Sequence, residues 1–252
     1  MLVRVQKIIA DRGYCSRRKA EEYIANKLVK VEGVIIEELG AKFEEDEVVI
    51  EVNGKILQPI IDAEKHYFLI NKPVGFVTTL SDDRGRKTVD MLVPARYGRL
   101  FPVGRLDINT SGALIMTNDG DFANLAMHPS SQFNKTYLVE IRGRFTPIDK
   151  TRLEKGIALE DGLTAPAKVE VVSCGISTSS ILITIHEGKN REVRRMMEAL
   201  NHGIISLSRR KVGSLSIAKL KTGQYAKIPV SIIDKIKETC IYNRDHNTYE
   251  KN

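Results

Sequence analysis

The fold is constrained most by the balance of strand-like and helix-like segments after residue 66. Stretches rich in β-branched and aromatic residues occur at 67–70, 76–79, 113–117, 136–141, 167–172 and 181–185. Helical patterns are fewer, at 121–127, 147–155, 191–200 and 231–239. So few helices cannot cover both faces of a doubly wound parallel sheet. The pattern therefore predicts an α+β fold with a mixed, mainly antiparallel sheet flanked by helices and loops.

A separate, smaller module is predicted before residue 58. Apolar residues indicate a first helix that ends at Gly13, and Ser16 can cap a second helix that begins with a basic cluster. Short strands follow at 29–31, 34–36 and 48–52. The apolar face of the first helix is expected to consist of Leu2, Val5, Ile8 and Ile9.

Pro59 and the polar stretch 62–65 interrupt both patterns and have little to bury. We therefore predict a small domain at 1–60, a larger domain at 64–240 and a polar tail at 241–252.

The distribution of charge indicates a polyanionic partner. The chain has 39 Lys and Arg against 32 Asp and Glu, which gives +7 and a pI of about 9.2. The alternative is a solvated basic surface, but the cations cluster. One cluster contains Arg12, Arg17, Arg18 and Lys19, and the other contains Lys189, Arg191, Arg194, Arg195, Arg209, Arg210 and Lys211.

Export and membrane insertion are not expected. The chain lacks an apolar run of the roughly 20 residues that a membrane helix needs, and its start lacks the features of a signal peptide. Its three cysteines form no CxxC pair, which indicates reduced thiols. We expect a cytoplasmic monomer with no membrane association.

Three segments carry residues with the potential for chemistry, and each has a structural alternative. Asp107 lies in the polar loop 104–112, where an Asp is commonly a turn former or a cap. Tyr137 lies in an apolar stretch and is either a core residue or a ring that stacks on an unpaired base. Arg191 and Arg194 lie near the start of a helix, where cations oppose the macrodipole, so either an anionic partner or a solvated face is implied.

Several common site signatures are missing from the sequence. It contains no GxxxxGK[ST], no GxGxxG after a strand, no HExxH and no paired Cys/His spacing. We therefore expect neither a cofactor nor a metal, and side-chain chemistry on a polyanion is the simplest enzymatic interpretation.

The motifs together resemble a known family. GRLDINTSGALIMTNDG (104–120), KTYLVEI (135–141) and HEGKNREVRRMMEALNH (186–202) resemble the rRNA pseudouridine synthases of the RsuA/RluB type. NKPVGFVTT (71–79) and LEDGLTAPAKV (159–169) extend the resemblance over most of residues 64–230. The resemblance implies a pseudouridine synthase catalytic domain that converts uridine to pseudouridine without cofactor or metal.

The same resemblance implies roles for individual residues. Asp107 corresponds to the nucleophile that lets the uracil ring detach, rotate and re-join through carbon. Tyr137 corresponds to the base-stacking tyrosine, and Arg194 to the basic residue that pairs with the carboxylate. A cation beside Asp107 would stabilise its charged form, which burial disfavours. Arg105 is implied to hold the extruded nucleotide or its backbone.

The N-terminal segment VQKIIADRGYCSRRKAEEYIANKLVKVEG resembles the S4-like (αL) RNA-binding domain. Such a module binds the phosphates of RNA and fixes the position of the protein along the RNA, but it contributes little to recognition of the base sequence. The residues expected to contact RNA are Arg12, Arg17, Arg18 and Lys19 in this module, with Lys189, Arg191 and Arg195 in the larger domain.

The versions EGKNREVRRM and APAKV resemble the branch of the family that acts on large-subunit rRNA. We therefore expect a target in 23S rRNA, of the 2605 class near the peptidyl-transferase centre, free or in an assembly intermediate. Two alternatives remain: a small-subunit (16S) rRNA pseudouridine synthase, and a non-catalytic ribosome-assembly factor that binds RNA.

Overall fold

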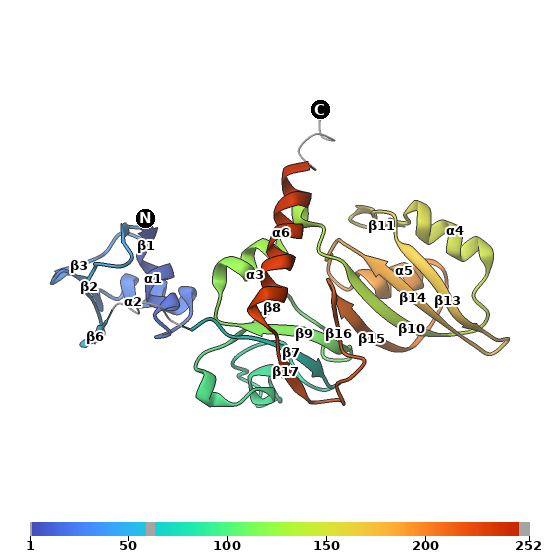
Figure 1. The fold of residues 1–252 in the computed structure, drawn as a ribbon, viewed down its shortest axis with the longest axis horizontal. Helices are drawn as coiled ribbons and strands as arrows, with labels where there is room; N and C mark the ends of the chain where they lie inside the picture. The colour runs from blue at the N-terminus through green and yellow to red at the C-terminus, as the bar shows by residue number, and fades with distance from the viewer. Residues whose placement is uncertain (1, 59–63, 247–252) are drawn as a thin grey trace. The chain divides into compact units, whose positions relative to one another are not determined.

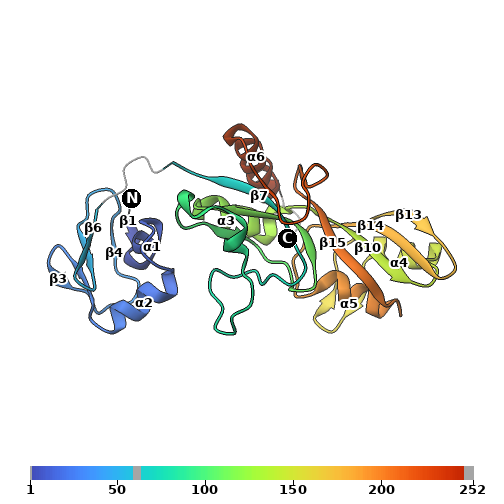
Figure 2. The same ribbon diagram turned by 90° about the horizontal axis from the view of Figure 1, so that it is seen from below.

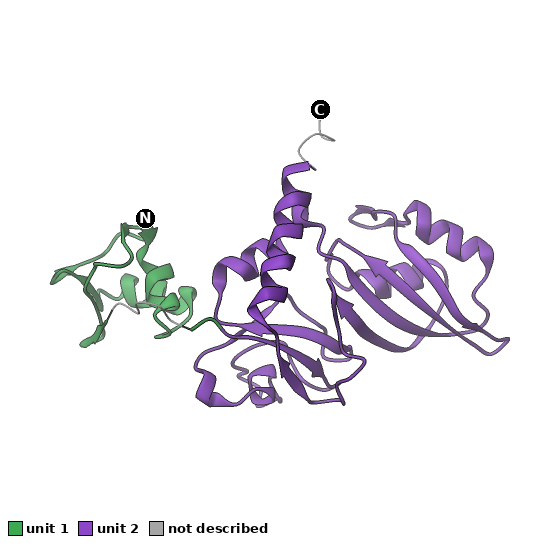
Figure 3. Cartoon of the chain, viewed as in Figure 1, with its two compact units in different colours: residues 1–65 green, residues 66–252 purple. Residues whose placement is uncertain are grey.

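The computed structural model describes residues 2–58 and 64–246. The chain divides into two compact units, residues 1–65 and 66–252 (Figure 3), and each is described by itself. Within the described ranges, no helix combines the length and the apolar character needed to cross a bilayer.

Within residues 2–58, the first unit contains two short helices and two small sheets (Figure 1). Strand β1 pairs antiparallel with β4, and the other sheet has the antiparallel order β3-β2-β5-β6. The elements are β1 (Leu2–Arg4), α1 (Val5–Asp11), α2 (Arg17–Ala25), β2 (Val29–Val31), β3 (Val34–Ile35), β4 (Lys42–Glu44), β5 (Ile50–Val52) and β6 (Lys55–Leu57).

The predicted cap of α2 is confirmed, whereas the predicted start of α1 is wrong. The Ser16 hydroxyl accepts a hydrogen bond from the Lys19 backbone N–H at 3.1 Å. Leu2 lies in β1 opposite Glu44, and 61% of it is exposed, so it takes no part in the helical face. Ile8 and Ile9 do pack into the core as expected, since both are fully buried.

The second unit is built on a nine-stranded sheet of order β13-β14-β10-β15-β9-β7-β17, with β16 and β8 paired beside β15 and β9. Only β9 and β15 pair in parallel among its named strands, so the predicted α+β fold with a mixed, mainly antiparallel sheet is confirmed. The strands are β7 (Tyr67–Lys72), β8 (Phe101–Val103), β9 (Ser111–Thr117), β10 (Lys135–Arg142), β13 (Lys168–Cys174), β14 (Thr178–Ile185), β15 (Ile204–Val212), β16 (Leu215–Ser216) and β17 (Tyr225–Lys227).

Helices cover both faces of this sheet, but over different strands (Figures 1 and 2). Alternate residues of β9 enter opposite cores: Leu114 belongs to the cluster that also contains residues of α4 and α5, whereas Ile115 belongs to the cluster with residues of α3 and α6. The remaining elements are α3 (Gly120–Met127), α4 (Pro147–Lys155), α5 (Glu192–Ala199), α6 (Val230–His246), the hairpin β11 (Ala158–Leu159) and β12 (Gly162–Leu163), and the 3-10 turns η1 (Val89–Leu92), η2 (Ala95–Tyr97) and η3 (Pro129–Ser131).

Two predictions in this unit are corrected. Residues 76–79 form no strand, because only Val77 makes an isolated bridge, to Thr88. The polar tail predicted for 241–252 is wrong for 241–246, which continue α6 to His246. Cys240 on this helix is buried, and Asn243 donates a hydrogen bond to the Ser131 carbonyl at 3.0 Å, which ties the last turns of α6 to η3. Residues 247–252 lie outside the described part of the chain.

The parallel contact between β9 and β15 depends on Gly112. Its Cα lies opposite that of Arg209, and its φ is +115°, which favours glycine. A methyl group at this position would collide with the backbone carbonyl of Arg209. The absence of a side chain therefore allows the strand that follows the Asp107 loop to lie directly against β15.

Gly112→Ala should lower the free energy of unfolding by at least about 2 kcal/mol, because strain and the collision with β15 add. Gly143→Ala is the matched control, since Gly143 also has a positive φ of 85° but nothing within 4 Å of an added Cβ. We expect the control to cost only about 1 kcal/mol. Equal denaturant midpoints for the two variants would contradict the close-contact explanation.

Candidate active site

Asp107 lies on the loop between β8 and β9, and the residues on both sides of it are fixed. Leu106 is 5% exposed, and its backbone C=O and N–H both hydrogen-bond to the Thr78 hydroxyl, at 2.7 and 3.2 Å. The Gly75 N–H donates to the Ile108 carbonyl at 2.8 Å. The Asp107 side chain is 34% exposed. The loop thus presents a partly exposed carboxylate on a rigid backbone.

Two arginines from the start of α5 approach this carboxylate. Arg194 Nε lies 3.7 Å and Arg191 Nη1 3.9 Å from Asp107 Oδ2. These distances are too long for direct hydrogen bonds but keep a strong electrostatic attraction. Arg194 Nη2 also donates to the Asn109 carbonyl at 2.9 Å and to the Thr110 hydroxyl at 3.1 Å. Arg194 therefore joins α5 directly to the Asp107 loop.

The Arg194 guanidinium sits in an unfavourable environment for a cation. Burial lowers its pKa, repulsion from Arg191 lowers it further, and Asp107 partly compensates. Its Nε is buried without a hydrogen-bond acceptor. An anionic group at this position, either Asp107 in a closer rotamer or an RNA phosphate, would satisfy that donor.

The other cations predicted near α5 are used differently. Arg195 makes a bidentate pair with Asp161 at 2.7 and 3.0 Å, and Lys189 donates to the Leu163 carbonyl at 3.0 Å. Both contacts anchor the β11–β12 hairpin. The structure thus brings Arg191 and Arg194 to Asp107, and it turns Arg195 and Lys189 towards the hairpin.

Tyr137 lies on β10 and is 9% exposed. It belongs to the same buried cluster as Leu106, the residue before Asp107. On the neighbouring strand β15, Arg209 lies opposite Tyr137, with its guanidinium carbon 6.0 Å from the centre of the Tyr137 ring. The burial of Tyr137 agrees with the core interpretation, and its base-stacking role stays a prediction.

Sequence reasoning assigned no site role to Arg209, which is 3% exposed. Its Nε donates to the Ala113 carbonyl at 2.7 Å, and its Nη2 is buried without a partner. In the sequence it belonged only to the second cluster of cations, where nothing distinguished the buried Arg209 from the neighbouring Arg210 and Lys211.

Lys72 is a second functional candidate that the sequence did not single out, although it lies in the NKPVGFVTT motif. It is fully buried and donates to the carbonyls of Pro73 at 3.0 Å and Phe76 at 2.8 Å. Burial lowers the pKa of Lys72 to about 8, Asp107 opposes this effect and Arg209 adds to it. Lys72 therefore shapes the turn that packs on the Asp107 loop and contributes to the positive field there.

In the first unit, Arg12 has a structural role. Its guanidinium donates to the carbonyls of Leu57, Glu45 and Val48, at 2.9, 2.8 and 2.8 Å. This use of Arg12 speaks against the predicted phosphate contact. The remaining predicted RNA contacts are exposed: Arg17, Arg18 and Lys19 at the start of α2, and Arg105 in the Asp107 loop.

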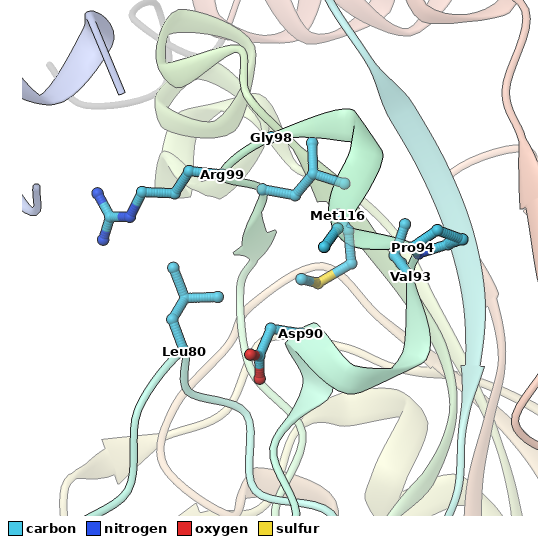
Figure 4. Close-up of a pocket in the computed structure, with 9 residues that line it drawn as sticks. Leu80, Asp90, Val93, Pro94, Gly98, Arg99 and Met116 are labelled. Carbon is cyan, nitrogen blue, oxygen red and sulfur yellow. The ribbon is translucent and has the colours of Figure 1, made fainter. Parts of the chain in front are cut away.

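A pocket of about 260 Å³, which Asp107 does not line, lies between β9 and the 3-10 turns η1 and η2 (Figure 4). Its lining is largely apolar, with the exposed Asp90 and the half-buried Arg99 at its margin. None of the buried unpaired polar side chains of the described residues lines it. Within the same described ranges, no three or more His, Cys, Asp or Glu side chains are arranged to hold a metal ion.

The site thus combines a carboxylate on a fixed loop with two nearby arginines, and a separate basic module precedes it in the chain. The RNA pseudouridylate synthase family matches residues 66–199, and the S4 domain matches residues 3–49. The chain therefore belongs to the RNA pseudouridine synthase family, whose members isomerise uridine in RNA, and it carries an S4 domain.

Individual relatives agree with this assignment. The ribosomal large subunit pseudouridine synthase B of Bacillus subtilis is 44% identical and covers 93% of this chain and 95% of the relative. An uncharacterized RNA pseudouridine synthase of Aquifex aeolicus is 37% identical over 90% and 91% of the two chains. A crystal structure of a pseudouridylate synthase aligns with a TM-score of 0.67 at 29% identity, over 93% and 99% of the chains. The predicted family and its large-subunit branch are thus confirmed.

Arg12→Ala should destabilise the first unit by about 1–3 kcal/mol, because it leaves three backbone carbonyls without their donor. Arg18→Ala, at an exposed position on α2, should leave stability within about 0.5 kcal/mol and instead reduce the salt dependence of RNA binding by about one unit of slope. Amide hydrogen exchange and RNA titrations at several salt concentrations measure the two effects. Normal protection in Arg12→Ala would contradict its structural role.

Proposed function

We propose that this protein converts a specific uridine of 23S rRNA to pseudouridine, with Asp107 as the nucleophile. The observation that carries the proposal is the partly exposed Asp107 carboxylate with Arg191 and Arg194 less than 4 Å away. Opposite charges at this distance favour the ionised carboxylate, the form that can attack an electrophilic carbon.

The reaction needs only a rearrangement of bonds within one nucleotide. Asp107 attacks the uracil ring or its ribose, and the bond between ribose C1′ and uracil N1 breaks. The detached ring turns, C5 bonds to C1′ as the bond formed by Asp107 breaks, the proton on C5 is lost and N1 gains a proton. Because no atoms are gained or lost overall, the chain's own side chains suffice for the chemistry.

Neighbouring groups have matching tasks in this scheme. Tyr137 stacks on the extruded base, as aromatic side chains commonly do when a nucleotide leaves its helix. Arg194 holds the carboxylate in place, and the exposed Arg105 contacts the extruded nucleotide or its backbone. Arg17, Arg18 and Lys19 bind phosphates through the S4 domain and supply affinity.

The proposed target is a uridine of the 2605 class near the peptidyl-transferase centre. Support comes from EGKNREVRRM and APAKV in this chain and from the 44% identical B. subtilis relative, whose name specifies the large ribosomal subunit. We place the enzyme in the cytoplasm as a monomer, acting on free rRNA or on an assembly intermediate. Pseudouridine formed only in 16S transcripts would instead favour the small-subunit alternative.

Asp107→Asn should reduce single-turnover formation of pseudouridine in a 23S rRNA fragment by at least about 1,000-fold, since the amide is a poor nucleophile. Binding of the fragment should persist, because the cations that contact RNA remain. Asp90→Asn, on an exposed carboxylate at the separate pocket, is the control and should retain activity. Turnover by Asp107→Asn at the wild-type rate would refute the assigned nucleophile.

A further inference from the structure

A row of four residues crosses the strands of the second unit where the Asp107 loop enters β9. Lys72 on β7 and Arg209 on β15 both lie opposite Gly112 on β9. Arg209 also lies opposite Tyr137 on β10. Residues directly opposite each other project from the same face of a sheet. The residues two positions away from the row all belong to one apolar cluster: Ile70, Leu114, Leu207 and Val139. The row therefore lies on the same face as that cluster.

An irregularity in the pairing of β10 with β15 decides which basic residue faces Tyr137. Thr136 lies opposite Lys211, but the next residue, Tyr137, lies opposite Arg209, so Arg210 is an extra residue on β15. In a regular ladder Tyr137 would face Arg210. Such a bulge changes which side chain a strand presents to its partner, and bulges are common next to active sites. Here it selects Arg209, the most deeply buried of three consecutive basic residues.

The Arg209 side chain links Tyr137 to the strand that follows the Asp107 loop. Its Nε donates to the Ala113 carbonyl at 2.7 Å, and its guanidinium carbon lies 6.0 Å from the centre of the Tyr137 ring. At this distance a cation attracts an aromatic ring. Because Gly112 has no side chain, the backbone of Arg209 also lies directly against β9. One residue therefore contacts both the ring and the strand.

Packing alone does not account for an arginine at this position. Arg209 is 3% exposed, and it is not among the arginines that form an ion pair within the described residues. Its Nη2 is buried without a hydrogen-bond partner. A buried cation without a counter-ion is unfavourable, and a well-packed apolar side chain of similar volume is often more stable. The guanidinium therefore points to a role in the site.

The row ends close to Asp107. Burial lowers the pKa of Lys72 to about 8, the charge of Asp107 opposes this effect, and the charge of Arg209 adds to it. Lys72 thus experiences both charges. Neighbouring strands are about 4.8 Å apart, so the row places the backbone of Tyr137 about 10 Å from that of Gly112, with Arg209 between them.

We propose that Arg209 is a positioning residue that fixes the Tyr137 ring relative to the Asp107 loop. Its guanidinium holds the ring through the cation–π contact, and its hydrogen bond to the Ala113 carbonyl ties this contact to β9. The inference rests on the proposed function, in which the extruded uracil stacks on Tyr137. Arg209 then sets the distance between the stacked base and the Asp107 carboxylate, and its loss leaves the base less often at the distance for attack.

Arg209→Met tests the proposal, because it keeps the length of the side chain but removes the charge and the donor. We expect the single-turnover rate on a 23S rRNA fragment to fall about 100-fold, as for a base misplaced by about 1 Å. Binding of the fragment should persist, since so deeply buried a cation contributes little to phosphate contacts. Arg142→Met, at an exposed position at the other end of β10, is the matched control and should keep the wild-type rate. A wild-type rate in Arg209→Met would overturn the positioning role.

Combination with Tyr137→Leu shows whether Arg209 acts through the ring. If it does, Arg209→Met lowers the rate of the Tyr137→Leu protein by no more than about twofold, because the ring that it positions is already absent. The same large fall in both backgrounds would show that Arg209 acts independently of Tyr137, and would contradict the proposal.

Arg209→Lys separates positioning from folding. It keeps a cation beside the ring, so it should recover part of the lost rate at an unchanged denaturant midpoint. An equal loss of rate in the lysine and methionine variants, with lowered midpoints in both, would assign Arg209 to the fold alone.

The contact also has a readout that needs no RNA. Carbon-13 labels in the tyrosine rings report on their surroundings by NMR, and Tyr137→Phe identifies the signals of Tyr137. Arg209→Met should shift these signals and leave those of Tyr14, in the first unit, unchanged. Unshifted Tyr137 signals would refute the contact. A wild type that forms no pseudouridine in any rRNA would refute the proposed function and leave the NMR result standing.

Discussion

The arrangement of the candidate site depends on the contact of Arg194 with the backbone and hydroxyl of the Asp107 loop. Its Nη2 donates to the Asn109 carbonyl and the Thr110 hydroxyl, which precede Arg194 in the chain by 85 and 84 positions. Because α5 buries its apolar face in the sheet, the direction of this guanidinium is set by the core. The end of the loop is fixed by the close contact between β9 and β15 at Gly112. The carboxylate is thus placed by packing before any substrate arrives.

The electrostatics of the second unit follow from the same arrangement. Lys72, Arg194 and Arg209 are buried or nearly so, and the partly exposed Asp107 carboxylate partly offsets the charges of Lys72 and Arg194. Buried cations with unsatisfied donors are costly, and RNA brings the phosphates and carbonyl oxygens that can satisfy them.

The sequence predicted those features of the fold that depend on interactions between residues close together in the chain. The Ser16 cap, the strand at β9 and the helix at α5 were all predicted from the sequence, because each depends on neighbours in sequence. Long-range contacts were not readable. Arg12 was predicted to contact phosphates, but it donates to three backbone carbonyls far away in the sequence. Arg209 was counted only among the clustered cations, and its burial on β15 was not predicted. The role of Asp107 came from resemblance to a family, since its spacing alone is equally typical of a turn residue.

The central claim is that Asp107, held by Arg191 and Arg194, isomerises one uridine of large-subunit rRNA. The most direct measurement is a nucleotide-resolution map of pseudouridine in rRNA from cells that lack this gene and carry either the wild-type or the Asp107→Asn protein. The account predicts one missing site in 23S rRNA that returns only with the wild-type protein. A missing site in 16S rRNA, or one restored by Asp107→Asn, would contradict it.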